Sequence, residues 1–251
     1  MKAWRWALAS ARGTSHAVSN ESCDDAGFCA MSHGASSSIF ATLSDGAGSA
    51  QFGGYGAWLA VRSMTLNMRA HLKKSSSVTE DDFWEWIDVS RDVITHVAER
   101  REVARRDFAA TLISIVSDGN ETIIAHIGDG SVVAKLEAGS WQALSWPSQG
   151  EYASTTYFIT DDPKPRLQIT RFTEPLTRLV AFTDGLERLA LDFTNGVPFE
   201  PFLEAISTPV AQSQATARDG NLSRALRDFL NSARVNERTD DDKTLLVAAL
   251  K

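Results

Sequence analysis

Aspartates stand at the ends of apolar segments in this chain. Runs rich in β-branched and aromatic residues predict strands, and four such runs occupy 38–44, 122–128, 178–183 and 244–250. The aspartates that lie directly after or just before these runs are Asp45, Asp129, Asp184 and Asp241. Because antiparallel neighbours place the start of one strand beside the end of another, we expect these carboxylates to collect at one edge of a sheet.

A cluster of carboxylates is suited to a hard metal ion. Carboxylates that lie close together repel one another, and their pKa values rise unless a cation compensates. Oxygen ligands select Mg²⁺ or Mn²⁺, and the glycine after Asp45 leaves a backbone carbonyl that a cation can approach. A single Asp-Gly pair is ordinarily a turn, but its recurrence at strand ends favours a metal site. Asp24 and Asp25 offer a further carboxylate, and the sequence leaves open which of the two serves.

The glycine-rich segment 43–57, LSDGAGSAQFGGYGA, does not match a phosphate-binding loop. Gly48 and Gly53 have the glycine spacing of a P-loop, but Gly54 and Tyr55 occupy the positions that need Lys and Ser or Thr. The dinucleotide-binding pattern G-x-G-x-x-G also fails here. We therefore predict that the aspartate of this segment, rather than its backbone amides, carries the chemistry.

Composition and charge argue against several protein classes. The 251 residues carry a net charge of -7, which disfavours a nucleic-acid partner and a metal-dependent nuclease. No apolar run approaches the roughly 18 residues of a membrane span, and Arg5 and Arg12 interrupt the apolar start, so neither a membrane segment nor a signal peptide is expected. Cys23 and Cys29 lack the Cys-x₅-Arg spacing of a cysteine phosphatase. We expect both as free thiols in a reducing cytoplasm.

The order of the predicted elements indicates an α+β fold with a mainly antiparallel sheet. Apolar stripes of helical period predict helices over 55–72, 80–100 and 222–233. Further strands are expected at 108–116 and 131–136, and from Phe28. Residues 145–165 carry turn-forming residues without a period and are expected to form a surface excursion.

Five segments occur in the order that is typical of one known family. SDGAGSAQFGG resembles its D-G-x-G-G segment, DFAATLI its G-x-T-A strand, IGDGS its G-D-S element, TDGLE its S-D-G element, and DDKTLLV its D-N-x-T strand. The chain is thus similar to the metal-dependent (type 2C, PPM) protein phosphatases, and most of all to a small bacterial branch. The match DDDKT at 240–244 to D-x-D-x-T, the motif of aspartyl-phosphate enzymes, is interpreted as accidental because it precedes the last strand.

That resemblance implies a single domain over residues 1–251, folded as a four-layer α-β-β-α sandwich of two mainly antiparallel sheets. Two ions of Mg²⁺ or Mn²⁺, or three, would lie at one end. Asp45 would bridge two of them, with Asp184 and Asp241 completing the first site. The metal ligands that the resemblance implies are Asp25, Asp45, Gly46, Asp129, Asp184 and Asp241, where Gly46 acts through its carbonyl, Asp25 through water and Asp129 at a third site.

The resemblance also implies a reaction and its partners. Two cations would activate a bridging water that attacks phosphoserine or phosphothreonine on a protein, and the substrate would be a cognate serine/threonine kinase or its targets. The 145–165 segment would form a flap beside the site. The family's phosphate-binding arginine is missing, and His16 is the candidate in its place; Arg188 stands where many members carry a third-metal aspartate. The alternative is a catalytically weak or inactive phosphoprotein-binding module on the same fold.

Overall fold

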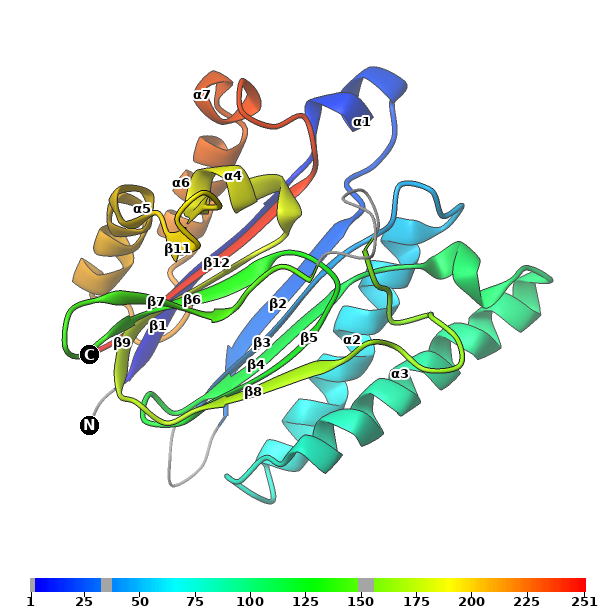
Figure 1. Cartoon of the computed structure of the whole chain (residues 1–251), viewed down its shortest axis with the longest axis horizontal. Helices are drawn as coiled ribbons and strands as arrows, with labels where there is room; N and C mark the ends of the chain where they lie inside the picture. The colour runs from blue at the N-terminus through cyan, green and yellow to red at the C-terminus, as the bar shows by residue number, and fades with distance from the viewer. Residues whose placement is uncertain (1–2, 33–37, 149–155) are drawn as a thin grey trace.

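The computed structural model describes residues 3–32, 38–148 and 156–251. Two five-stranded sheets pack face to face, and helices cover their outer faces (Figure 1). Every strand pair within these two sheets is antiparallel. The predicted α-β-β-α sandwich with two antiparallel sheets is therefore confirmed.

Each sheet brings together strands that are distant in the sequence. The first sheet has the order β1 (Trp4–Ala11), β12 (Lys243–Leu250), β9 (Leu176–Phe182), β6 (Ser131–Leu136) and β7 (Trp141–Ser145). The second has the order β2 (Asp25–Met31), β3 (Ile39–Asp45), β4 (Leu112–Ser117), β5 (Thr122–Ile127) and β8 (Gln168–Phe172). A separate hairpin joins β10 (Leu191–Asp192) to β11 (Val197–Pro198).

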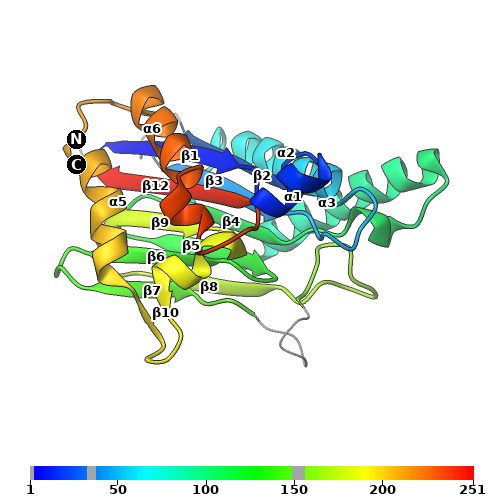
Figure 2. The same cartoon turned by 90° about the horizontal axis from the view of Figure 1, so that it is seen from above.

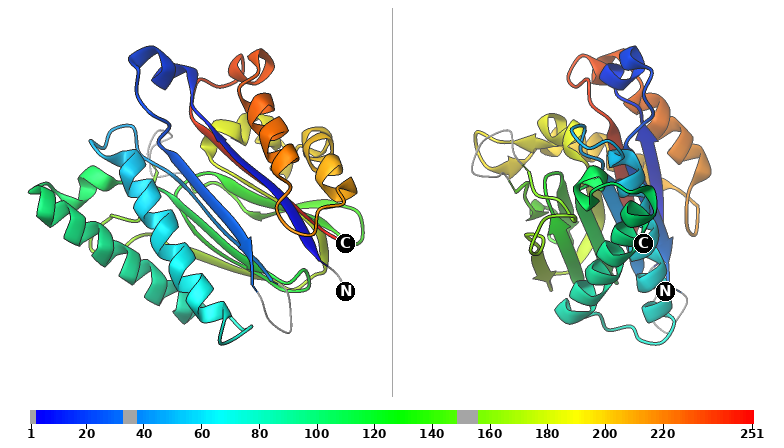
Figure 3. Two further views of the ribbon diagram at one scale, coloured as in Figure 1. Left: turned by 180° about the vertical axis from the view of Figure 1, so that it is seen from behind. Right: turned by 90° about the vertical axis from the view of Figure 1, so that its right-hand side faces the viewer.

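The long helices divide between the two sheets. α2 (Gly53–Leu72) and α3 (Glu80–Arg101) cover the second sheet, whereas α5 (Glu200–Gln212) and α6 (Gly220–Leu230) cover the first (Figures 2 and 3). The short helical segments are α1 (Thr14–Ser19), η1 (Arg105–Phe108), η2 (Asp184–Leu186), α4 (Glu187–Ala190) and α7 (Ala233–Asn236). None of the described helices is long and apolar enough to cross a membrane.

Three apolar layers hold the sandwich together. The middle layer lies between the sheets and contains Leu43, Ile115 and Leu246. The other two layers each lie between a sheet and its helices, and they contain Met64 of α2 and Leu203 of α5. α3 begins at a capping box in which Thr79 and Asp82 bond to each other's backbone. Burial on both faces of each sheet fixes the strand register, and with it the strand ends.

The described fold contains elements that the sequence patterns did not predict. β1, β7, β8 and α5 were missed, and the strand expected from residue 108 begins only at Leu112. That strand starts late because Asp107 accepts a hydrogen bond from the Ala104 amide and closes the turn of η1. α5 escaped detection because Pro209 lies inside it, and a proline inside a helical pattern weakens a helix prediction.

Candidate metal centre

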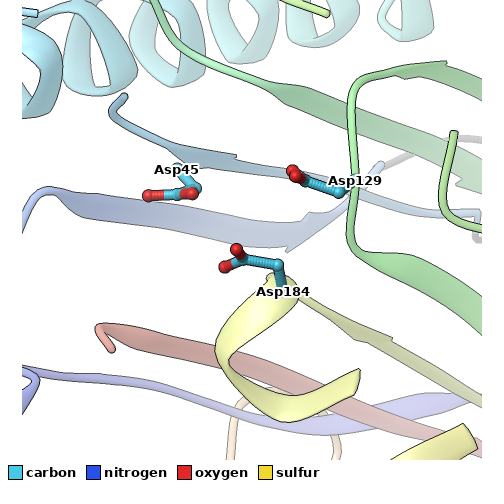
Figure 4. Close-up of side chains that lie close together, drawn as sticks. All are labelled: Asp45, Asp129 and Asp184. Carbon is cyan, nitrogen blue, oxygen red and sulfur yellow. The ribbon is translucent and has the colours of Figure 1, made fainter. Parts of the chain in front are cut away.

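Three of the predicted aspartates meet at one end of the sandwich. Each of Asp45, Asp129 and Asp184 offers a carboxylate oxygen, and these oxygens lie within 4.8 Å of one another (Figure 4). Asp45 ends β3, Asp129 lies in the turn between β5 and β6, and Asp184 follows β9. The group therefore draws on both sheets, and it forms because strand ends from each sheet come together there.

Buried oxygens in and beside this group lack hydrogen-bond partners. Among the described residues, Oδ1 of Asp25, Asp129 and Asp184 is buried and accepts no hydrogen bond. Buried polar atoms in folded proteins are almost always paired, so an oxygen without a partner in an all-carboxylate cluster fits a cation. Carboxylate oxygens are the ligands that Mg²⁺ and Mn²⁺ prefer. The donor set thus fits the metal ions expected from the sequence.

Asp25, rather than Asp24, faces the cluster. Asp25 is buried and pairs in register with Asp45 across β2 and β3. The Thr183 hydroxyl donates to its Oδ2 at 2.7 Å. The Asp24 carboxylate turns instead to the start of α2, where a Cβ added to Gly54 would lie 2.3 Å from its Oδ1. The structure thereby separates two neighbours that the sequence could not distinguish.

Burial and mutual repulsion raise the pKa values of the whole cluster. Burial, followed by the charges of Asp129 and Asp241, raises the pKa of Asp184 to about 8. Burial, with a smaller contribution from the charge of Asp242, raises the pKa of Asp25 to about 7, against the effect of its hydrogen bonds. Burial is also the largest cause of the raised pKa values of Asp45 and Asp129. A cation would relieve this repulsion.

Asp241 borders the cluster from the wall of an open cleft. It is exposed and lies just before β12, and its charge contributes to the raised pKa values of Asp45, Asp129 and Asp184. The cleft has a volume of about 710 Å³ and is lined by Asp129, Asp184 and Asp241. It leads from solvent to the carboxylates and has room for a phosphorylated side chain.

Comparison with known proteins identifies the family of this chain. A family model described as protein phosphatase 2C matches residues 12–231. The chain belongs to the protein phosphatase 2C family. It is 38% identical to serine/threonine-protein phosphatase 3 of Escherichia coli (strain K12), and the alignment covers 98% of each chain. The family assignment in the sequence analysis is confirmed, and with it the assignment of the chain as a protein phosphatase.

Solved structures agree with the fold of this 2C phosphatase. PppA of Pseudomonas aeruginosa, a key regulatory component of T6SS, superimposes with a TM-score of 0.69 at 15% identity over 100% of both chains. The serine/threonine phosphatase Stp1 of Staphylococcus aureus gives a TM-score of 0.64 at 14% identity, over 98% of this chain and 94% of Stp1. At such identities the likeness supports the architecture alone.

Two side chains that sequence reasoning missed hold the Asp129 turn in the phosphatase. Glu187 accepts a hydrogen bond from the Gly130 amide at 2.8 Å, and burial raises its pKa to about 7, with Asp129 adding to the effect. The Nε2 atom of buried His126 donates to the Asp129 carbonyl at 3.0 Å, and its Nδ1 accepts from the Ser145 hydroxyl. The sequence signal for Glu187 was its place in the segment TDGLE.

Asp242, the neighbour of Asp241, anchors the N-terminal loop. Its side chain is almost fully buried and accepts hydrogen bonds from the backbone amides of Gly13, at 2.6 Å, and Asp24. His16, in α1, places Nδ1 3.0 Å from Asp242 Oδ2. Although partial burial lowers it, the pKa of His16 is raised overall by that bond and by nearby carboxylates. The sequence signal for Asp242 was its place in the segment DDKTLLV.

The loop after Asp45 is too crowded for any side chain at Gly46. A Cβ there would lie 2.2 Å from the carbonyl carbon of Gly53 and 2.4 Å from the amide nitrogen of Gly54. The Gly46 amide donates to the Asp24 carbonyl at 3.1 Å. The glycines therefore let the loop turn back against the first residues of α2, and this close approach holds Asp45 at the cluster.

The predicted flap falls partly outside the described residues, which exclude 149–155. The described ends of the 145–165 segment border the cleft through Pro147, Ser148 and Thr156. His16 is not among the described residues that line this cleft. Cys23 and Cys29 are both free thiols, as the sequence predicted.

Proposed function

We propose that this 2C phosphatase hydrolyses phosphoserine and phosphothreonine on proteins with two Mg²⁺ or Mn²⁺ ions held by the aspartate cluster. The observation that carries the proposal is the convergence of Asp45, Asp129 and Asp184, with buried oxygens that lack partners. The likeness to the serine/threonine-protein phosphatase of E. coli supports the substrate class.

Each carboxylate has a proposed place in the centre. Asp45 would bridge the two ions, because it pairs with Asp25 on one side and lies near Asp184 on the other. Asp184, Asp241 and the Gly46 carbonyl would complete the first site, and Asp25 would serve the second. Asp129 would hold a third ion.

The protein's own groups orient the carboxylates that would hold the ions. When bound, the ions supply a water of lowered pKa and positive charge for the phosphoryl oxygens. The Thr183 hydroxyl fixes the orientation of Asp25, and the amide of Thr244 donates to the same hydroxyl at 2.9 Å. The role of His16 in substrate binding stays a prediction, as do a cognate kinase or its targets as substrate and a cytoplasmic location.

The test is hydrolysis of p-nitrophenyl phosphate and of a phosphothreonine peptide, with Mn²⁺ and with chelator. We expect turnover that depends on Mn²⁺ and is lost in chelator. Asp45→Asn should lower kcat/KM by at least about a hundredfold, since removal of one charge-stabilising group at a reaction centre typically has that effect. Asp81→Asn, at an exposed site in the first turn of α3, serves as the matched control.

Two results would contradict the proposal. Full metal-dependent activity in Asp45→Asn would show that the cluster is not the reaction centre. Tight phosphopeptide binding without turnover in Mn²⁺ would instead favour the alternative of a phosphoprotein-binding module, which the missing arginine of the family motif suggested.

A further inference from the structure

An apolar groove of about 930 Å³ runs beside the candidate metal centre, on the outer face of the first sheet. Its walls come from α5, α6 and the β10–β11 hairpin, and this group of helices lies on the side of the molecule opposite α2 and α3 (Figures 1 and 2). We call it the α5–α6 groove. Its volume is at the upper end of the range for small-molecule pockets.

The walls of the α5–α6 groove expose large apolar side chains to solvent. Phe193 and Phe199 are 43% and 46% exposed. Phe202 on α5 and Phe229 on α6 lie with ring centroids 6.3 Å apart and are only partly buried. Exposed apolar surface gathered in one place, rather than scattered, is typical of a binding site.

The α5–α6 groove and the acidic cleft meet along a shared border. The four residues that line both are Arg188, Leu189, Phe193 and Arg238. A chain that places a side chain in the cleft therefore continues directly into the groove. This continuity favours an occupant that belongs to the same molecule as the phosphate in the cleft.

The charges along this border suit a phosphate. Arg188 and Arg238 are exposed, and in the described parts of the chain no salt bridge engages either guanidinium. Arg234, also exposed, adds a third positive charge on the groove wall. Guanidinium groups bind phosphate oxygens in bidentate fashion. Arg188 and Arg238 lie at the border between the cleft of carboxylates and the apolar groove.

We propose that the α5–α6 groove binds apolar side chains that flank the phosphorylated residue of the protein substrate, while Arg188 and Arg238 guide its phosphate into the cleft. This inference rests on the proposed phosphatase function and adds a substrate class to it: segments in which phosphoserine or phosphothreonine lies within a few residues of aliphatic or aromatic side chains. The groove takes these side chains because it removes apolar surface from water.

The test compares substrates on the wild-type enzyme with Mn²⁺. Phosphothreonine peptides of equal length and charge carry leucine and phenylalanine on the N-terminal side, the C-terminal side, both sides or neither, and p-nitrophenyl phosphate reports on the metal centre alone. We expect kcat/KM to be at least about tenfold higher for a peptide with apolar flanks, as burial of one large apolar side chain typically produces. Fluorescence anisotropy with labelled non-hydrolysable phosphonate peptides measures binding separately from turnover.

Two variants of the groove test whether it causes the preference for peptides with apolar flanks. Phe199→Ser removes an exposed aromatic ring from the groove wall. Ala225→Glu places a charged side chain in the groove from an exposed position on α6. Both should reduce the ratio of kcat/KM between apolar-flanked and polar-flanked peptides towards one. Leu66→Ser, which removes a side chain 52% exposed on α2, is the matched control and should keep the wild-type ratio. Circular dichroism and Tm establish that each variant is folded, and either folded variant decides the question.

The possible results distinguish a failure of the phosphatase proposal from a failure of the groove inference. No hydrolysis of p-nitrophenyl phosphate by the wild type in Mn²⁺ would overturn the phosphatase proposal, and the groove inference with it. Hydrolysis of p-nitrophenyl phosphate with a peptide ratio near one would overturn the groove inference alone. An unchanged ratio in a folded Phe199→Ser or Ala225→Glu protein would likewise overturn it, as would an equal loss in Leu66→Ser.

Discussion

Asp25 and Asp45 face each other as register partners on β2 and β3, one at the first residue of its strand and the other at the last. Asp25 is buried beside the carboxylate cluster to which Asp45 belongs, and the charge of Asp25 is, after burial, the largest cause of the raised pKa of Asp45. Two carboxylates in this arrangement make the metal-free protein sensitive to pH, since only a proton or a cation relieves their repulsion.

The metal-free protein should lose stability as pH rises from about 4 to about 8. The folded-state pKa values of Asp25, about 7, and Asp184, about 8, lie above the ordinary value of 3.8. The folded protein therefore keeps protons that the unfolded chain has released, and each pH increase in this window favours unfolding. Mn²⁺ replaces those protons, so its stabilising effect should be larger at pH 8 than at pH 6. Calorimetry in chelator and in Mn²⁺ at both pH values measures this.

The expected difference in the Tm gain between the two pH values is several degrees, because about 1 kcal/mol shifts Tm by about 2–4 °C in a chain of this size. Asp45→Asn should abolish most of the Mn²⁺ effect. A metal-free protein that is more stable at pH 8 than at pH 6 would contradict the assignment of these buried acids.

Asp242→Ala should destabilise the protein and reduce activity together. The substitution leaves the buried amide of Gly13 and the partly buried amide of Asp24 without an acceptor and frees the ring of His16. A buried donor without a partner costs about 1–3 kcal/mol, so we expect a loss of about 2–4 kcal/mol in the free energy of unfolding from urea titration. Asp228→Ala, at an exposed position on α6, should change stability by less than about 0.5 kcal/mol.

The phosphatase activity of Asp242→Ala provides a second test of the role of this side chain. The loop from Gly13 to Asp24 leads into Asp25, so its release should raise the Mn²⁺ concentration required for half-maximal turnover. An Asp242→Ala protein with wild-type stability and metal requirement would show that the loop is positioned by other contacts.

Strand periodicity and strand-end acids made much of the centre predictable. The structure brings Asp45, Asp129 and Asp184 together as the pattern predicted, because each stands at the end of a continuous apolar strand and precedes a glycine. Such a signal is local, because adjacent residues determine both the strand and the position where it ends. The antiparallel pairing of β12 with β9 then brings Asp241 near Asp184, as the general rule for strand ends predicts.

The remaining features depend on contacts between distant residues. The Asp242 carboxylate meets the Gly13 amide across 229 positions of sequence, and no local pattern encodes such a bond. β1 was missed because Arg5 interrupts its apolar run, yet Arg5 is buried in the strand and its guanidinium donates to the Ser213 carbonyl. A distant partner thus made a charged residue compatible with a buried strand.

Glu204→Gln should destabilise the protein at neutral pH but not in strong acid. Glu204 accepts hydrogen bonds from Lys135, Trp141 and Arg178, and chiefly the bond from Lys135 lowers its pKa to about 2. A lowered pKa stabilises the fold above the ordinary value of 4.5, and this contribution is lost as pH falls towards 2. We expect a loss of about 1 kcal/mol at pH 7, since the carboxylate is partly exposed and screened by solvent.

Urea unfolding at pH 7 and at successively lower pH values measures the Glu204 contribution. The difference between wild type and Glu204→Gln should shrink as the pH falls below 4.5. Glu85→Gln, at an exposed position on α3, should match the wild type throughout. A difference that is constant with pH would mean that the variant acts through packing rather than through charge.

Gly46→Ala and Gly48→Ala should have opposite outcomes although they lie two residues apart. A Cβ at Gly46 would lie 2.2 Å from the backbone of Gly53, whereas one at Gly48 would meet nothing within 4 Å. Since backbone atoms cannot rotate away, Gly46→Ala must push Asp45 or the start of α2 out of place, at about 1–3 kcal/mol of stability. Gly48→Ala should change stability by less than about 0.5 kcal/mol.

Activity separates displacement of Asp45 from a simple loss of stability. At a temperature where both variants are fully folded, Gly46→Ala should need more Mn²⁺ and turn over p-nitrophenyl phosphate at least about tenfold more slowly, because a small misplacement at a reaction centre has effects of that size. Gly48→Ala should keep wild-type kinetics. Equal behaviour of the two variants would show that the close approach at Gly46 does not position Asp45, and that the loop tolerates a side chain wherever it lies.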